Sequence, residues 1–577
     1  MIRKPGRARP VSLDVWSAPA RDWVRLGAEE DAVRGSAARL ARRQFADRVW
    51  RKDPFAWKSD ATHRAIIEDA LGWLDAPGEM QRRERELIDW AHHARQGRRH
   101  VVLCGMGGSS LAPEVFARVL GDPLAPELLV LDSTSPEQVR GVLERIDLDA
   151  ALFLIASKSG GTLETLTHFR FFHDLVRRRT GSQERAGAQF VAITDSGSPL
   201  EKLAVEHRFS EVFENLPGIG GRYSALSYFG LVPAALCGVD LTRLLEGASE
   251  AAEACRAAGA GNPGVTLGSA LGTFARAGRD KATIVCSPEV APFGAWLEQL
   301  IAESTGKEGV GIVPVDGEPL GWPEDYGADR LFAYERLDGS PGNGDLDARL
   351  DRLAEEGHPV VACAWKDRTD LGARMFIWEF AVAVAGALLE IDPFDQPNVK
   401  ESKDNTAAVL KEFERNGTLP RPSGREEDGI VLSGERPGAL LARAREGRDY
   451  LALQAYVDRN PENEAALAAL RRELRNRTRC ATTVGFGPRF LHSTGQLHKG
   501  GPKEGLFFQL VAPGTADVAI PGSPYGFSVF LEAQALGDEK ALRERKLPFC
   551  GAAAAGSSHE AIAAWARTLS RALGKRR

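Results

Sequence analysis

The sequence has few of the features that mark exported and membrane proteins. Its seven cysteines are odd in number, scattered, and never form a Cys-x-x-Cys pair, which excludes a disulfide scaffold and is typical of a reducing compartment. The basic N-terminus contains no apolar segment, and no run approaches the roughly 18 apolar residues of a membrane helix. We therefore expect a cytoplasmic protein that is not exported by the general route and has no membrane partner.

An excess of positive charge is also absent. The formal net charge of −5 at pH 7 argues against nucleic acid as a partner, because binding to phosphate backbones requires a basic surface. The 577 residues are enough for two to four domains, each with its own core. The composition is that of an enzyme-sized protein acting on small molecules.

Apolar strand patterns alternate with helical patterns along most of the chain, which predicts an α/β fold of doubly wound parallel sheets. The second of two such units ends in a long apolar helix over Ala373–Leu389, and a Pro/Gly/charge-rich linker follows over 417–428. The predicted divisions are a helical N-terminal extension at 1–95, a first α/β unit at 96–245, a second at 246–416, and a C-terminal α/β segment at 429–577.

The most informative stretch begins where an apolar strand runs into Ser157 and continues through Lys158, Ser159, Gly160, Gly161 and Thr162 to a helix. Hydroxyl donors, glycines that allow close approach and the exposed N–H groups of a helix start together form a phosphate cradle. Lys158 could contribute its ammonium group or only its amide. The alternative is an ordinary strand-to-helix turn with Ser and Thr as caps.

A second glycine-rich turn, Gly105–Ser110, also follows an apolar strand. It is not a dinucleotide fingerprint, because Ser110 occupies the third glycine position and Asp132 comes later than the roughly twenty residues expected. It is not a P-loop either, since no Gly-Lys-Ser/Thr closes it. Two anion-binding turns without a nucleotide signature predict a phosphorylated small molecule as the ligand.

Two further segments carry side chains suited to catalysis. Arg222 lies in a glycine-rich loop, from which a cation can reach a developing oxyanion, although a surface salt bridge is the plain alternative. Gln299 and Glu303 are spaced i, i+4 and so share one helix face, where a carboxylate can act as a general base. A solvated Glu on an amphipathic helix is the competing interpretation.

Taken in order, these segments resemble the phosphoglucose isomerase family of the sugar-isomerase (SIS) superfamily. The matching motifs are Gly-x-Gly-Gly-Ser at 105–109, Ser-Lys-Ser-x-x-Thr-x-Glu-Thr at 157–165, Gly-Gly-Arg-x-Ser-x-x-Ser at 220–227, Gln-x-x-x-Glu-Ser-x-Gly-Lys at 299–307 and Phe-Asp-Gln-x-x-Val-x-x-x-Lys at 394–403. The resemblance implies two SIS-like, flavodoxin-like units followed by the C-terminal α/β segment.

The resemblance also implies an activity, the interconversion of glucose 6-phosphate and fructose 6-phosphate through a cis-enediolate, with a sugar phosphate as partner and neither cofactor nor metal. Ser157, Lys158, Ser159 and Thr162 would bind the phosphate, with Ser159 standing where Thr is common. The other implied site residues are Gly108 and Ser109 lining the sugar, Gln299 beside the base, Gln396 and Lys403 contacting substrate, Arg222 stabilising the enediolate, and Glu303 moving the proton between C1 and C2.

The family's ring-opening histidine is missing at its usual place, where this chain has Tyr326–Phe332. Candidates occur later, at His492 and His498, in a segment similar to the isomerase half of fused transaldolase/phosphoglucose isomerase proteins. We expect His498, in a Gln-x-His-Lys-Gly-Gly loop, to open the ring with Lys403.

Two alternative functions stay open, a broader glucose/mannose phosphate isomerase and a sugar-phosphate-sensing regulator without catalysis. The sequence leaves the oligomeric state open as well, with a homodimer as one option.

Overall fold

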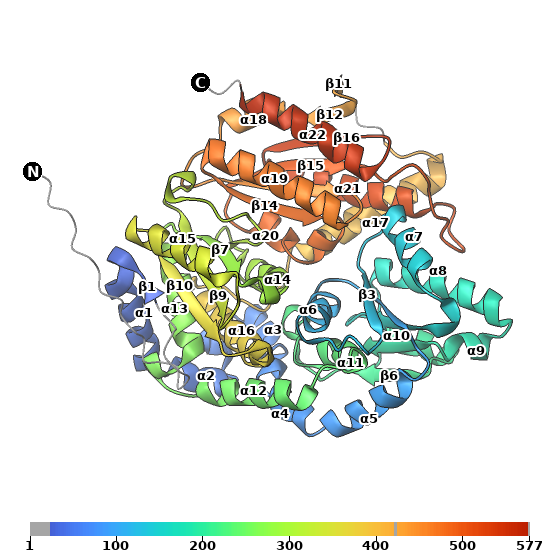
Figure 1. Cartoon of the computed structure of the whole chain (residues 1–577), viewed down its shortest axis with the longest axis horizontal. Coiled ribbons are helices and arrows are strands. Elements are labelled where there is room, and N and C mark those ends of the chain that lie inside the picture. The colour runs from blue at the N-terminus through green and yellow to red at the C-terminus, as the bar shows by residue number, and fades with distance from the viewer. Residues whose placement is uncertain (1–23, 421–423, 575–577) are drawn as a thin grey trace, which may run out of the picture.

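The computed structural model describes residues 24–420 and 424–574, so the first 23 residues of the predicted N-terminal extension lie outside it. Figure 1 shows three α/β units arranged around a common centre, with the C-terminal unit at the top and the other two side by side below it. Each unit contains one sheet, as the alternating pattern predicts. The predicted fold class of doubly wound parallel sheets is confirmed.

The first sheet is entirely parallel and has the strand order β3-β2-β4-β5-β6. In chain order this is 2-1-3-4-5, the flavodoxin-like order, in which ligands bind where the order reverses, here between β2 and β4. The two predicted anion-binding turns follow β2 and β4. The strands are β2 (His100–Gly105), β3 (Glu127–Leu131), β4 (Ala151–Ala156), β5 (Phe190–Thr194) and β6 (Glu211–Glu214).

Helices cover both faces of this sheet, and their apolar residues bury strands such as β4, in which every residue is buried. They are α6 (Leu111–Leu120), α7 (Pro136–Arg145), α8 (Leu163–Thr180), α9 (Gln183–Gly187), α10 (Pro199–Glu206) and α11 (Tyr228–Leu236).

The second sheet repeats the same strand order in its parallel part, β8-β7-β9-β10, and adds β1 (Val24–Arg25) antiparallel to β10. Its parallel strands are β7 (Lys281–Cys286), β8 (Val313–Val315), β9 (Arg330–Leu337) and β10 (Val360–Trp365). The helices before this sheet are α12 (Leu241–Ala254) and α13 (Pro263–Arg276). Its other helices are α14 (Phe293–Thr305), α15 (Asn343–Glu355), α16 (Leu371–Leu388) and α17 (Val399–Asn416).

The predicted apolar helix is α16, and it is long and apolar enough to cross a membrane, but 83% of its apolar window is buried inside the protein. It packs against α12, α13 and α14 as the central core helix of this unit. Its hydrophobicity is therefore accounted for by internal packing.

The third sheet has the order β11-β12-β16-β15-β13-β14, and its parallel part again reads 2-1-3-4. Its strands are β11 (Arg425–Glu427), β12 (Ile430–Gly434), β13 (Tyr450–Tyr456), β14 (Ala481–Phe486), β15 (Gly505–Val511) and β16 (Phe549–Ala553). The predicted linker thus contains a short edge strand, β11, which pairs antiparallel with β12. Its helices are α18 (Pro437–Ala442), α19 (Pro461–Thr478), α20 (Gly495–Gly500), α21 (Phe527–Glu544) and α22 (Ser558–Leu573).

The helices before the first sheet are integrated into the molecule. Trp57 and Trp73 belong to the largest core cluster, which joins the first two units, and Trp57 donates a hydrogen bond from Nε1 to the carbonyl of Ala383 in α16. These helices are α1 (Glu30–Arg42), α2 (Phe45–Trp50), α3 (Ala61–Glu68), α4 (Ala76–Gln81) and α5 (Glu84–Ala94), drawn in blue in Figure 1.

Candidate active site

The predicted phosphate cradle has the local geometry of an anion site. Ser157 is buried at the end of β4, and its Oγ lies 2.8 Å from Oγ1 of Thr162. Thr162 is the N-cap of α8 but makes no capping hydrogen bond with its side chain. The first N–H groups of an 18-residue helix therefore face the turn together with the two hydroxyls.

The other two predicted donors of the cradle, Lys158 and Ser159, have different environments. The Lys158 ammonium lies 2.6 Å from Oδ2 of Asp195, so its charge is directed to that carboxylate. Ser159 is exposed, and its Oγ accepts a long hydrogen bond of 3.4 Å from the amide of Gly161. Of the two ways in which Lys158 could contribute, the geometry favours its amide.

The second glycine-rich turn sets how closely the backbones of Gly221 and His492 approach the end of β2. A Cβ on Gly108 would lie 1.9 Å from the carbonyl oxygen of Gly221, and a Cβ on Gly107, whose φ is +56°, would lie 2.7 Å from the carbonyl oxygen of His492. Only glycines permit both approaches. The turn that carries Ser109 is thereby brought against the loop of Arg222 and the segment of His492.

Arg222 is 2% exposed and is fixed by three acceptors from distant segments. Its Nε donates to Ser304 Oγ at 2.8 Å, and its Nη2 donates to the carbonyls of Pro393 and Asp395 at 2.7 and 3.0 Å. Its remaining nitrogen, Nη1, lies 3.7 Å from Oε1 of Glu303. The surface salt-bridge alternative is therefore excluded, because the guanidinium is held rigidly inside the protein beside a carboxylate.

Gln299 connects the predicted base to a segment almost two hundred residues away. Its Nε2 donates to Glu303 Oε2 at 3.1 Å and to the carbonyl of His492 at 2.8 Å. Glu303 itself is buried, which excludes the interpretation of a solvated Glu on an amphipathic helix. One amide thus fixes the orientation of the carboxylate and the position of the His492 backbone.

Half-buried His492 pairs with Glu164, the buried acidic residue of the cradle motif. Its Nε2 lies 2.9 Å from Glu164 Oε1, which also accepts from Gln534 Nε2 at 2.8 Å. Burial by itself raises the pKa of Glu164, but the charge and hydrogen bond of His492, with a smaller contribution from Lys403, lower it to about 2. Glu164 is therefore ionised near neutral pH and places a negative charge beside the imidazole.

The Phe-Asp-Gln segment and α17 border the same region. Lys403 is exposed on α17, within electrostatic range of Glu164, and Gln396 is exposed just before that helix. The start of α17 is tied to α20 by Gln496, whose Oε1 accepts from the Asn398 amide at 2.9 Å and whose Nε2 donates to Gly306 O at 3.0 Å. The two predicted substrate contacts thus lie near the cluster, and their roles stay predictions.

His498 is placed elsewhere. Its ring packs among Tyr450, Phe490 and Phe507, and its Nδ1 lies 3.4 Å from Gln454 Nε2. Burial, together with the charge of Lys499, lowers the pKa of His498 to about 3. A neutral core histidine cannot donate a proton near pH 7, so the structure does not support the assignment of ring opening to His498. The position suited to that role is occupied by His492.

An acidic cluster behind Arg222 is absent from the sequence-based interpretation. His63 of α3 lies 3.0 Å from Asp392 and 3.6 Å from Asp395, and all three offer ligand atoms within 4.8 Å of one another. The Lys307 ammonium already lies 2.7 Å from Asp395 Oδ1, and Arg222 donates to the backbone carbonyl of Asp395. Lys307 therefore compensates the Asp395 carboxylate, and the cluster holds the backbone that positions Arg222.

Sequence reasoning missed Glu164, Gly107, Gln534 and this support cluster. Glu164 and Gly107 stand inside motifs that the sequence presents, so their identity was visible, but their partners are not local. Gln534 and His63 carry no motif at all.

Comparisons with known proteins agree with this geometry. The phosphoglucose isomerase family model matches residues 80–317, the stretch that contains the cradle, the Arg222 loop and α14. The glucose-6-phosphate isomerase of Rubrobacter xylanophilus is 29% identical over 393 residues, covering 60% of this chain and 90% of the relative. That of Methanocaldococcus jannaschii is 27% identical over 349 residues, covering 55% of this chain and 85% of the relative. The predicted resemblance is confirmed.

Two solved structures share the fold. A protein of Thermus thermophilus aligns with a TM-score of 0.56 at 24% identity, covering 68% of this chain and 100% of that chain. A glucose-6-phosphate isomerase from Chlamydia trachomatis aligns with a TM-score of 0.52 at 19% identity, covering 67% of this chain and 86% of that chain. About a third of the present chain has no counterpart in either.

Proposed function

We propose that this chain, which is similar to the phosphoglucose isomerase family over residues 80–317, interconverts glucose 6-phosphate and fructose 6-phosphate. The observation that carries the proposal is the buried Arg222–Glu303 pair at 3.7 Å, linked through Gln299 to the His492–Glu164 pair. An aldose–ketose isomerisation needs one carboxylate base, a cation at the developing oxyanion and an acid for ring opening. Glu303, Arg222 and His492 are the candidates for these three roles, and they lie in one cluster.

The phosphate of the substrate binds in the cradle after β4. Ser157 and Thr162 donate from their hydroxyls, and the amides at the start of α8 complete the anion site. The amide of Lys158 contributes, while its ammonium stays with Asp195. Anchoring the phosphate fixes the distance from C1 and C2 to Glu303, which is the positional part of catalysis.

His492 opens the ring. Its Nε2 bonds to ionised Glu164, so a protonated imidazole has Nδ1 free to deliver a proton to the ring oxygen. Glu303 then removes the proton from C2 and returns it to C1, and Arg222 stabilises the negative charge on the enediolate oxygens. Lys403, on α17, assists the opening step from the exposed side of the site.

The C-terminal segment of the same chain supplies His492. A homodimer remains one option for the assembly. A sensor without catalysis would not need a base beside an oxyanion cation, so the enzyme is favoured over the regulator. We infer a cytoplasmic location from the sequence composition.

A coupled assay with glucose 6-phosphate, fructose 6-phosphate and mannose 6-phosphate tests the function directly. We expect turnover of the first two. Turnover of mannose 6-phosphate would extend the function to the broader isomerase, and binding without turnover of any of them would favour the sensor.

Glu303→Gln tests the assigned base. The amide keeps the shape and the hydrogen bonds of the side chain but cannot accept the C2 proton, so turnover should fall by at least about a hundredfold while sugar-phosphate binding survives. Near-normal turnover of this variant would exclude Glu303 as the base.

A further inference from the structure

A polar cavity lies next to the candidate site, where α14 meets the C-terminal unit. It has a volume of about 420 Å³, within the range of small-molecule pockets. Among the described residues that line it, none is a predicted site residue. However, its lining residues Glu298 and Ser493 directly adjoin Gln299 and His492 in the chain. The cavity is therefore separate from the site but shares two of its supporting segments.

Three arginines converge on this cavity, and two of them are already paired. Arg489 lies 2.7 Å from Asp132 and also binds Glu114, while Arg459 lies 3.0 Å from Glu114 and 2.8 Å from Glu464.

The third arginine, Arg471 of α19, is 2% exposed. Among the described residues, its guanidinium hydrogen-bonds to Thr482, at 2.6 and 3.4 Å, and makes no direct ion pair with a carboxylate. The charges of Glu318, Asp316 and Glu298 act on it from a greater distance. A buried guanidinium without a carboxylate in direct contact is costly, and a bound anion would offset that cost.

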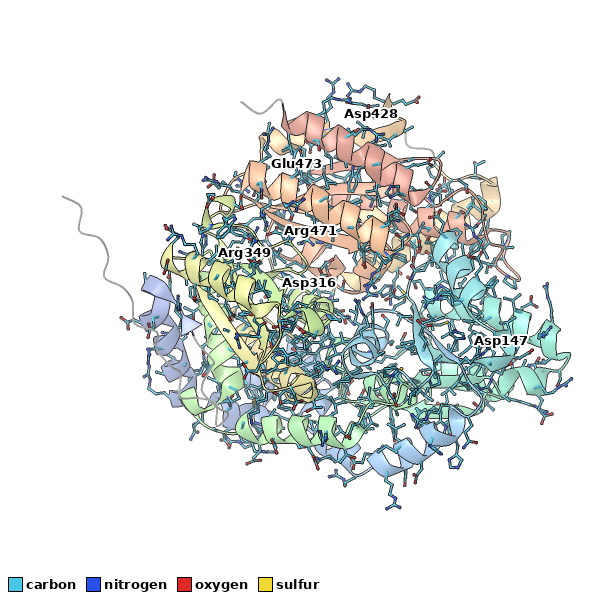
Figure 2. The ribbon with its side chains drawn as sticks, viewed as in Figure 1. Asp147, Asp316, Arg349, Asp428, Arg471 and Glu473 are labelled. Carbon is cyan, nitrogen blue, oxygen red and sulfur yellow. The ribbon has the colours of Figure 1, made fainter. Side chains whose placement is uncertain are left out.

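Two carboxyl groups face the same cavity. Glu298 on α14 and Asp316, just after β8, are both partly accessible there, and Figure 2 shows Asp316 and Arg471 on the two sides of the junction. Burial, together with the charge of Asp316, raises the pKa of Glu298 to about 8, and burial raises that of Asp316 to about 6. Near neutral pH the pair can both donate and accept hydrogen bonds, which suits hydroxyl groups.

We propose that this cavity binds a small polyhydroxylated anion, whose anionic group pairs with Arg471 and whose hydroxyls bond to Glu298 and Asp316. The carboxyl ends of the edge strands β8 and β14 open into the cavity. A ligand there bridges α19 to α14, and so acts on the segments that hold Gln299 and His492. It changes kcat without competing with the sugar-phosphate substrate, and its binding does not depend on the proposed function.

Calorimetric titration of the full chain with gluconate and with glycerol 3-phosphate tests the proposal and separates a carboxylate ligand from a phosphate ligand. Neutral glucitol is the control for the anionic group. We expect at least one of the two anions to bind with a Kd of about 1 mM or tighter, with no binding of glucitol.

Two pairs of variants locate the binding. Arg471→Met should weaken it at least about tenfold, whereas Arg472→Met, an exposed neighbour on α19, should leave it unchanged. Ala468→Phe fills the cavity and should abolish binding, whereas Ala469→Phe on the exposed side should not. The second pair covers the case in which Arg471→Met does not fold.

The proposal is overturned if neither anion binds the wild-type chain, if glucitol binds equally well, or if the variants of each pair behave alike. Absence of isomerase activity in the same preparation would count against the proposed function and not against this cavity.

Discussion

His492 and His498 lie six residues apart in one segment of the C-terminal unit, yet they have opposite environments. His492, in η11 (Arg489–His492), pairs with ionised Glu164 at 2.9 Å and adjoins the Gln299–Glu303 face. His498, in α20, is surrounded by three aromatic rings and kept neutral. The motif around a histidine thus says less about its chemistry than the carboxylate or aromatic group that tertiary packing places beside it.

Among the variants that test this comparison of the two histidines, His492→Ala should have the largest effect on turnover. Ring opening loses its proton donor, so turnover of cyclic substrate should fall by about 10² to 10⁴-fold, measured in the coupled assay. Solvent-deuterium exchange into an open-chain analogue should be nearly spared, because Glu303 remains. The matched control, His498→Gln, should retain near wild-type turnover. If the two variants acted in the opposite order, the comparison would be reversed and His498 would be the acid.

Glu164→Gln should have the next largest effect. The amide keeps the hydrogen bond to His492 but not the negative charge that stabilises the imidazolium, so kcat/KM should fall about tenfold or more. Steady-state kinetics with the coupled assay measures the change. Gln534→Leu, which removes the neutral partner of the same carboxylate, serves as the control and should change kcat/KM much less. An unaltered kcat/KM for Glu164→Gln would argue against the pair.

A smaller effect is expected from Gln496→Ala, in α20, the helix that also contains His498. Gln496 ties the start of α17 to Gly306, and α17 carries Lys403. Loss of these hydrogen bonds should raise KM by a few-fold, with kcat changed less, because the substrate contacts of α17 are positioned less well. Steady-state kinetics measures the two constants separately. An equal and large loss of kcat would instead place Gln496 in the chemical step.

His498→Gln should have the smallest effect on turnover, but it should change the pH dependence of the free energy of unfolding. The folded pKa of His498 is about 3, below its unfolded value near 6.5, so the unfolded chain takes up a proton first as the pH falls. This group contributes stability that is full above about pH 6.5 and is lost at about 1.4 kcal/mol per pH unit below it. Between pH 7 and pH 5 the wild type should lose about 2 kcal/mol more than the variant in urea unfolding. Identical pH slopes would contradict the neutral core assignment.

The strands and the turns that follow them could be read from the sequence. Strands such as Phe190–Thr194 and Val360–Trp365 follow the predicted alternation, because buried parallel strands are short apolar runs bounded by helical patterns. The antiparallel strands β1, β11 and β12 were not predicted. β1 and β12 pair with β10 and β16, which lie far away in the chain, and local patterns do not encode such partners.

The sequence by itself determined the residue types of the site, since the cradle, the Arg222 loop and the Gln299–Glu303 face are each defined within a few residues. Only the tertiary structure decided which of them meet. The Gln299 contact to His492 spans 193 residues, and the Glu164 contact to His492 spans 328. Such contacts follow from how three sheets pack together, and the approach of Gly107 and Gly108 to neighbouring backbones sets their spacing. For that reason the histidine with the richer local motif lies in the aromatic core, and the other lies beside a buried carboxylate.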